Sequence, residues 1–214
     1  MKISSEKAYK IFWIVVAVLG IAGGFYYRFR TNAADERGAT VLMRSFEQPT
    51  DKRTVERLIK HTKDLNKKDK AGQTALFYAV RHKSDLALIR KLIDSGADVN
   101  CADNAGRTAL MLAARNNTSL EILKELLGRG ALVEATDKNG QTALLDAAQH
   151  STPTMVRLLL RAGADPEATN KDGKTAAELI SENEKFTDEE KTNYHQALIV
   201  LSIIGPIRAI EPGK

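Results

Sequence analysis

The sequence is poor in cysteine and in aromatic residues, two kinds of residue that often carry a function. Its 214 residues include one cysteine, and Phe, Trp and Tyr together make up only 6%. The single Cys101 excludes an intramolecular disulfide framework and a cysteine-rich zinc module. No GxSxG, HExxH, CxxC or Walker-type glycine-rich motif is present. The sequence therefore predicts no catalytic residue, no cofactor and no metal site.

Net charge is also scarce outside one short segment. The formal net charge is +5, but residues 1–30 contain five Lys or Arg and one Glu, so the rest of the chain sums to only +1. The hydrophobic content of 43% is too high for a disordered chain, and the charged content of 28% is too high for a multispan membrane protein. A nearly neutral main part with few aromatic residues disfavours nucleic-acid binding.

The N-terminal segment contains an uncharged run at residues 11–27, IFWIVVAVLGIAGGFYY. As a helix these residues would span about 26 Å, close to the ~30 Å of a hydrocarbon core. Trp13 lies near one end and Tyr26 near the other, as interfacial aromatic residues do. Arg28 and Arg30 follow directly and extend the effective length by reaching outward. We predict one transmembrane helix that acts as an uncleaved signal-anchor.

Three further points concern this segment. The basic residues among positions 1–10 favour a cytoplasmic N-terminus, with the bulk of the chain across the membrane; repeats that face the cytosol are the alternative. Ala22 and Gly24 also suit the small positions before a signal-peptide cleavage site. Gly20 and Gly24 have the GxxxG spacing, which would allow a homodimer through paired helices.

The rest of the chain is built from internal repeats. The segment DKAGQTAL at 69–76 recurs as DNAGRTAL at 103–110, as DKNGQTAL at 137–144 and as NKDGKTAA at 170–177. The glycines of these segments, at positions 72, 106, 140 and 173, follow one another with a nearly constant period. A second motif lies at a fixed distance: GADVN at 96–100, GALVE at 130–134 and GADPE at 163–167. Two motifs at a constant offset identify a repeat architecture.

Each repeat predicts a turn followed by two helices. Asp-x-x-Gly is turn chemistry, because the Asp accepts local backbone hydrogen bonds and the Gly adopts positive φ. The Thr two residues after the Gly is predicted to cap a first helix. Ser84, Thr118 and Thr152 are predicted to begin the second helices, which carry an apolar stripe such as Leu88 and Leu92. The Gly of the second motif is predicted to end that helix.

One helix pair cannot bury its apolar side alone, so we expect an all-α solenoid of stacked helix–turn–helix units with hairpin loops. The repeated segments resemble the ankyrin-repeat family, closely over residues 69–180. The family's Thr-Pro-Leu-His motif has Ala here at the Pro position and Phe77, Met111, Leu145 or Glu178 at the His position. These departures remove some pre-organisation and one hydrogen-bonding group from each unit, but they do not threaten the fold.

The sequence divides accordingly. The predicted parts are a basic tail at 1–10, the membrane segment at 11–27, a linker at 28–35, a divergent N-terminal capping repeat at 36–68, repeats at 69–102, 103–136 and 137–169, a divergent C-terminal capping repeat at 170–205, and a tail at 206–214.

The resemblance implies a non-enzymatic protein-binding scaffold whose contacts lie on its concave side. In the ankyrin family, hairpin turns and first helices line this side, here named the inner face. Carried onto this sequence, the implied positions are Lys70, Gln73, Arg81, His82, Asn104, Arg107, Arg115, Asn116, Lys138, Gln141, Gln149, His150, Lys171 and Lys174. Seven of these residues are Lys or Arg, which suggests an acidic protein partner; a face that is merely solvated is the alternative.

The repeats look like those of bacterial ankyrin proteins, which suggests a single-pass protein of the bacterial inner membrane with its repeats in the periplasm. The other functional class is a secreted effector, released by cleavage after Gly24 and bound to host proteins.

Overall fold

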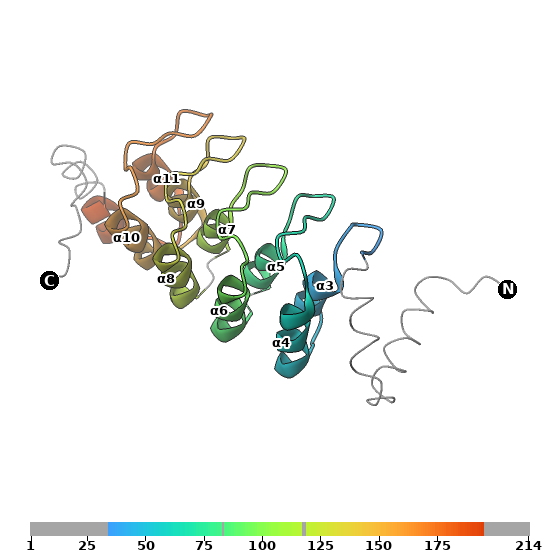
Figure 1. Ribbon diagram of the computed structural model, residues 1–214. Helices are drawn as coiled ribbons and strands as arrows, with labels where there is room; N and C mark the ends of the chain where they lie inside the picture. Colours follow the sequence, from blue (N-terminus) through green and yellow to red (C-terminus); the bar gives the residue numbers. More distant parts are fainter. Residues whose placement is uncertain (1–33, 83, 117–118, 195–214) are drawn as a thin grey trace, which may run out of the picture.

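The computed structural model describes residues 34–82, 84–116 and 119–194 as successive helix pairs (Figure 1). The helices are α3 (Val41–Glu47), α4 (Lys52–His61), α5 (Ala75–Arg81), α6 (Leu86–Asp94), α7 (Ala109–Arg115), α8 (Leu120–Gly128), α9 (Ala143–His150), α10 (Pro153–Arg161) and α11 (Ala176–Glu182). Residues 188–194 are also helical. Within these ranges no β-strand occurs beyond an isolated bridge between Ala102 and Thr108, which confirms the predicted all-α class.

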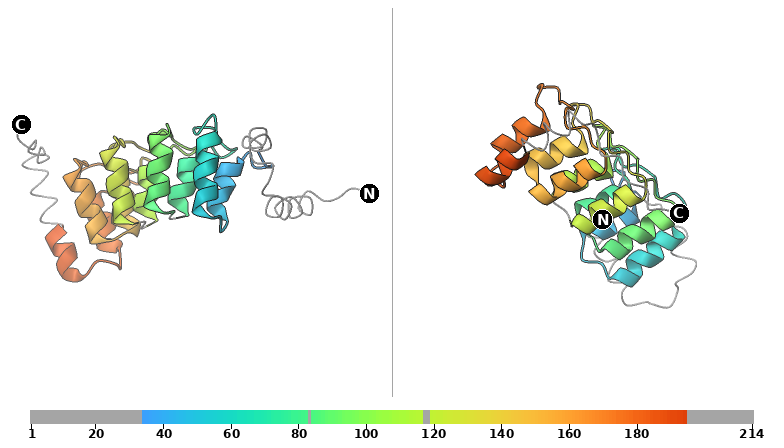
Figure 2. Two further views of the ribbon diagram at one scale, coloured as in Figure 1. Left: turned by 60° about the horizontal axis from the view of Figure 1, so that its bottom comes forward. Right: turned by 90° about the vertical axis from the view of Figure 1, so that its left-hand side faces the viewer.

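The helices form two layers. The first helices of the units, α3, α5, α7, α9 and α11, contact one another in chain order, and the second helices α4, α6, α8 and α10 do the same beside them. Figure 2 shows this stack from two further sides. The first helices form the inner layer and the second helices the outer layer. The inner layer packs closely because small side chains lie between its helices: Ala79, Ala113 and Ala147 are fully buried. Ile89, Leu123 and Val156 from the outer layer complete a continuous core.

The Asp-x-x-Gly turns connect the units and confirm the predicted role of the aspartates. Asp69 Oδ1 accepts hydrogen bonds from Ala71 N at 2.9 Å and from Gln73 N at 2.8 Å, and Asp103 and Asp137 make the equivalent pairs. Neighbouring turns are linked by backbone hydrogen bonds, for example from Asn104 N to the Ala71 carbonyl at 2.9 Å. The turns thereby form a ladder along one edge of the stack.

The first unit carries the same turn. Asp35, the last residue of the expected linker 28–35, accepts through Oδ1 from the backbone N–H groups of Arg37 and Ala39, each at 2.9 Å. Lys70 N donates to the Arg37 carbonyl at 2.8 Å, so this turn is the first step of the ladder. The sequence contains the signal for it, since Gly38 precedes Gly72 by one repeat period.

The helix caps follow the sequence with small corrections. Thr108 and Thr142 cap their helices through side-chain hydrogen bonds at 3.4 and 3.3 Å, whereas Thr74 occupies the cap position of α5 without one. The second helices α6 and α8 are capped by Asp85 and Ser119, each one residue after the predicted Ser84 and Thr118. The caps lie one residue later because the side-chain oxygen of the residue directly before each helix accepts a hydrogen bond from the backbone N–H of the second helical residue, Ala87 or Glu121.

No helix in residues 34–82, 84–116 and 119–194 is long and apolar enough to cross a membrane. The predicted membrane segment 11–27, with its Gly20 and Gly24 pair, lies outside these ranges. The same holds for residues 195–205 of the predicted C-terminal cap and for the tail 206–214.

Candidate functional site

The predicted partner-binding residues come from two places in the fold. Eight lie in the turns, and the other six lie at the C-terminal ends of α5, α7 and α9. Lys70, His82, Asn104, Arg115, Lys138, Gln149 and Lys171 are exposed; Arg81, Arg107, Asn116, Gln141, His150 and Lys174 are half-buried; Gln73 is buried.

One glutamine of the set is buried, and another has a buried side-chain oxygen. Gln73 has only 6% of its surface exposed, because it closes the turn: its N–H donates to Asp69 and its carbonyl accepts from the Asp69 N–H. The side-chain oxygen of Gln141 is buried, and it has no hydrogen-bond partner in the described part of the chain. Gln73 is therefore not available on the inner face.

Arg107 is held by an ion pair inside its own turn. Its Nε and Nη2 lie 2.9 and 2.6 Å from Oδ2 of Asp103, whose side chain is only 1% exposed. The same carboxylate accepts two backbone N–H groups of the turn through Oδ1. Arg107 thus neutralises a buried turn carboxylate and leaves little net charge for a partner.

Arg115 on α7 pairs with the next unit. Its Nη1 lies 3.4 Å from Oδ1 of Asp146 on α9, whose side chain is 4% exposed. Burial raises the pKa of Asp146 to about 6 despite the attraction of Arg115, and the nearby Asp137 carboxylate adds to the increase. A buried carboxyl group on an inner helix is therefore partly protonated near pH 6.

His150 and Lys174 are also engaged within the molecule. Burial lowers the pKa of His150, with further contributions from the positive charges of Arg115 and Lys185, which favours the neutral imidazole. Lys185 Nζ donates to the His150 carbonyl. Lys174 Nζ lies 2.6 Å from a carboxylate oxygen of Glu182 on α11.

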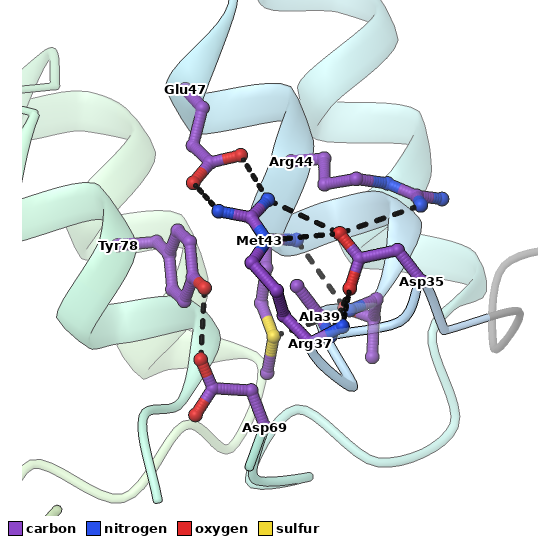
Figure 3. A network of polar contacts seen from close by, with 9 residues as sticks. Asp35, Arg37, Ala39, Met43, Arg44, Glu47, Asp69 and Tyr78 are labelled. Carbon is purple, nitrogen blue, oxygen red and sulfur yellow. Dashed lines mark hydrogen bonds and ion pairs between the residues drawn. The ribbon is translucent and has the colours of Figure 1, made fainter. Parts of the chain in front are cut away.

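The first unit adds a polar network that the predicted set does not contain (Figure 3). Arg37 makes two hydrogen bonds to Glu47, at 3.0 and 2.9 Å, and its Nε lies 3.2 Å from Asp35 Oδ2. Hydrogen bonds to Glu47 and then to Asp35 raise the pKa of Arg37. Asp35 and Gly38 have the Asp-x-x-Gly spacing of the later turns, and recognising this turn in the sequence would have placed Arg37 on the inner face.

Next to this network lies a buried aromatic side chain of a first helix. Tyr78 on α5 donates its hydroxyl hydrogen to Asp69 Oδ2 at 2.9 Å (Figure 3). Burial and this hydrogen bond raise the pKa of Tyr78 to about 12. The Arg81 guanidinium lies 6.0 Å from the centre of the Tyr78 ring, and the His82 ring stacks at 6.4 Å. Arg81 therefore has a cation–π contact at the limit of the usual range.

Apart from Arg81, the cations of the inner face fall into two groups. Arg107, Arg115 and Lys174 are paired with Asp103, Asp146 and Glu182. Lys70, Lys138 and Lys171 are exposed and make no ion pair within residues 34–82, 84–116 and 119–194. They occupy the same register in three turns, where the ladder hydrogen bonds fix their backbone. The inner face is a row of internal ion pairs edged by turn lysines, and it is less positive than its seven cations suggest.

The described residues hold no feature that indicates a reaction. In them no group of three or more His, Cys, Asp or Glu residues could hold a metal ion. Cys101 is half-buried 3.4 Å from Asp98 Oδ2, and burial raises the pKa of its thiol, which disfavours the reactive thiolate.

Comparison with known proteins agrees with the repeat architecture. A family model described as ankyrin repeats (3 copies) matches residues 14–103, 82–170 and 110–200. Together these overlapping matches extend from residue 14 to residue 200. A search of curated proteins finds no match to the chain.

Proposed function

Because this chain belongs to the ankyrin-repeat family, whose members are typically non-enzymatic, we propose that it is a scaffold that binds a partner protein on its inner face. Ankyrin repeats generally mediate protein–protein interaction. We further propose that the inner face binds an acidic segment of the partner, and that this segment lies along the turns.

The turn lysines carry this part of the proposal. Lys70, Lys138 and Lys171 are exposed. The carboxylates that precede the first two, Asp69 and Asp137, already accept N–H groups of their own turns, whereas Asp172 beside Lys171 is exposed. Packed units repeat about every 10 Å, so the three ammonium groups form a long but unevenly spaced row: Lys138 and Lys171 lie in adjacent turns, and the turn between Lys70 and Lys138 has Asn104 at this position. A partner segment with spaced carboxylates would complement this row, mainly by increasing the rate and specificity of association.

We also propose that residues 11–27 tether the scaffold as a single-pass helix in a bacterial inner membrane, with the repeats in the periplasm. The apolar composition, the aromatic residues at both ends and the basic first ten residues support this placement. Protease added to spheroplasts should then digest the repeats, and repeats that stay protected would contradict the periplasmic location.

Site-specific photo-crosslinking in cells tests the binding face. A photoreactive amino acid at Gln149, which is exposed on α9, should give a defined adduct, whereas one at the exposed Thr154 on α10 should not. The triple variant K70Q/K138Q/K171Q should lose most of the Gln149 adduct, because the attraction between the turns and an acidic segment is removed.

The matched control is the double variant K124Q/R161Q, which removes exposed cations from the outer helices α8 and α10. It should leave the adduct unchanged. An adduct that forms from Thr154 alone, or one that survives both the turn-lysine variant and a high salt concentration, would refute the inner face as an electrostatic binding surface.

A further inference from the structure

The outer side of the solenoid has a strongly uneven charge. The second helix of each unit, with its cap and following loop, covers residues 51–68, 85–102, 119–136 and 152–169 in the first four units. The first of these segments contains seven Lys or Arg and three acidic residues, a net charge of +4. The other three have net charges of −1, −1 and 0. The positive charge of the repeat domain is thus concentrated on the outer side of the first unit.

Helix α4 presents these cations outward. Val55, Leu58 and Ile59 on its opposite side are buried in the core, while Arg53 and Lys60 on the helix and Lys63 after it are exposed. Arg53, Lys60 and Lys63 have no ion pair in the part of the chain that the structure describes.

Other polar groups of this segment are used to hold its shape. Lys52 pairs with Asp85 of the second unit at 2.7 Å, and Lys68 Nζ donates to the Ala102 carbonyl at 2.7 Å. Among the acidic residues, Asp51 caps α4 by accepting from Thr54 N, and Asp64 accepts from Asn66 N. The segment is therefore tied to its neighbour, and two of its three carboxylates are bound to backbone amides.

The position of this basic surface in the chain indicates what it faces. The first unit is the end of the described stack that is nearest in sequence to the apolar run (Figure 1). Residues 28–33 separate the run from Ala34, and six residues span at most about 22 Å even when extended. If residues 11–27 cross a bilayer, the first unit cannot leave the vicinity of its headgroups.

We propose that the basic outer surface of the first unit, formed by Arg53, Lys60 and Lys63, docks on the anionic phospholipid headgroups of the membrane that anchors the chain. The inference rests on the proposed membrane tether. Anionic headgroups suit this surface because they offer diffuse negative charge on a flat plane, which scattered lysines and arginines bind without a groove. The later units have no excess of positive charge on their outer sides, so they remain off the bilayer with their inner face free for a partner.

With the tether in place, a modest electrostatic attraction is sufficient for the first unit to dock on the membrane. Docking is intramolecular once the helix is inserted, so a small attraction per cation already shifts the equilibrium. Juxtamembrane lysines and arginines each strengthen binding to anionic membranes about fivefold, and three of them therefore change the ratio of docked to undocked protein on the order of 100-fold.

The experiment uses the full chain inserted into vesicles of phosphatidylcholine alone or of phosphatidylcholine mixed with the anionic lipid phosphatidylglycerol. A fluorophore is attached through His61→Cys in a Cys101→Ser background and is quenched by lipids that carry a nitroxide on the headgroup. His61 is exposed at the end of α4, so the label reports close approach of this surface. Quenching should be strong in anionic vesicles, weak in zwitterionic vesicles and lost at high salt concentration.

The variant R53Q/K60Q/K63Q should lose quenching in anionic vesicles, whereas K91Q/K124Q/R161Q, which removes three exposed cations from the second helices of later units, should retain it. Vesicle flotation after alkaline extraction is measured on the same samples. A chain that stays inserted but is quenched equally in both lipids, or regardless of the first-unit variant, overturns the docking surface and leaves the tether standing. A chain that does not float with the vesicles overturns the tether, and the docking proposal with it.

Discussion

Replacing Gly72 by alanine tests whether the ladder of turns stabilises the solenoid. Gly72 and Gly173 occupy the same position in two turns, with φ values of +80° and +74°. A Cβ atom at Gly72 would lie 2.6 Å from the backbone nitrogen of Asn104 and 2.5 Å from its side-chain oxygen. A Cβ atom at Gly173 would meet nothing within 4 Å. The two positions therefore share the conformational cost of alanine but differ in the clash.

The free energies of unfolding should separate the two variants. The left-handed conformation costs alanine about 1–2 kcal/mol in both, and the loss of glycine entropy in the unfolded chain is the same and cancels in the comparison. Gly72→Ala must also displace Asn104, whose N–H donates to the Ala71 carbonyl at 2.9 Å and whose Nδ2 donates to the Lys70 carbonyl at 2.8 Å. At about 1 kcal/mol for each hydrogen bond, we expect Gly72→Ala to cost about 2 kcal/mol more than Gly173→Ala.

Urea denaturation of the full chain in mild detergent, followed by far-ultraviolet circular dichroism, gives the comparison. Amide hydrogen exchange locates the effect, because units of a solenoid can open separately. The Asn104 amide should exchange faster in Gly72→Ala and remain protected in Gly173→Ala. Equal losses of stability in the two variants, with Asn104 protected in both, would refute a stabilising role for contacts between turns.

Four other substitutions give three further tests. The folded-state pKa of Asp146, about 6, is above its ordinary value of 3.8, so stability should fall as the pH rises from about 4 to about 6 and then level off. The change from this group is about 2–3 kcal/mol, and Asp146→Asn should remove it from the pH profile of the urea midpoint; an unchanged profile would contradict the assignment. Thr108→Ala should cost about 1 kcal/mol of unfolding free energy, because it removes the side-chain hydrogen bond that caps α7. Thr74→Ala should cost less, since the Thr74 hydroxyl is buried without a partner in the described residues. Equal costs of the two substitutions in thermal melts would contradict this expectation. Leu132 is 60% exposed at the position where other units have Asp98 and Asp165, whose Oδ1 atoms each accept a hydrogen bond from the backbone N–H two residues later. Leu132→Asp should therefore stabilise the third unit by about 0.5–1 kcal/mol. A lower urea midpoint would show that this hydrogen bond does not form in the third unit.

The fold could be predicted well because its rules are local. A turn aspartate, a glycine with positive φ and a capping threonine act within one short stretch of chain, so their recurrence at a nearly constant spacing revealed the units. The same rule extends to Asp35 and Gly38, although the diverged remainder of the first unit hid it. The helix starts at Asp85 and Ser119 differ from Ser84 and Thr118 by one residue, since neighbouring polar residues have almost equal capping ability.

The candidate binding face could be predicted only in part. Register placed the turn residues and the ends of the first helices, and the structure finds most of them accessible, with Gln73 as the buried exception. Sequence spacing did not reveal which charges neutralise one another. Arg115 and Asp146 belong to different repeats and meet only because α7 packs on α9.

The sequence by itself determined the repeat, its turns and its caps, because each depends on hydrogen bonds between residues close in the chain. It also placed the excess of lysine and arginine in residues 51–68. The tertiary structure alone decided which cations are paired, that Asp146 is buried, and that the basic residues of the first unit face outward. The physical reason is that electrostatic pairing and desolvation depend on distances between units, which are set when the helices stack.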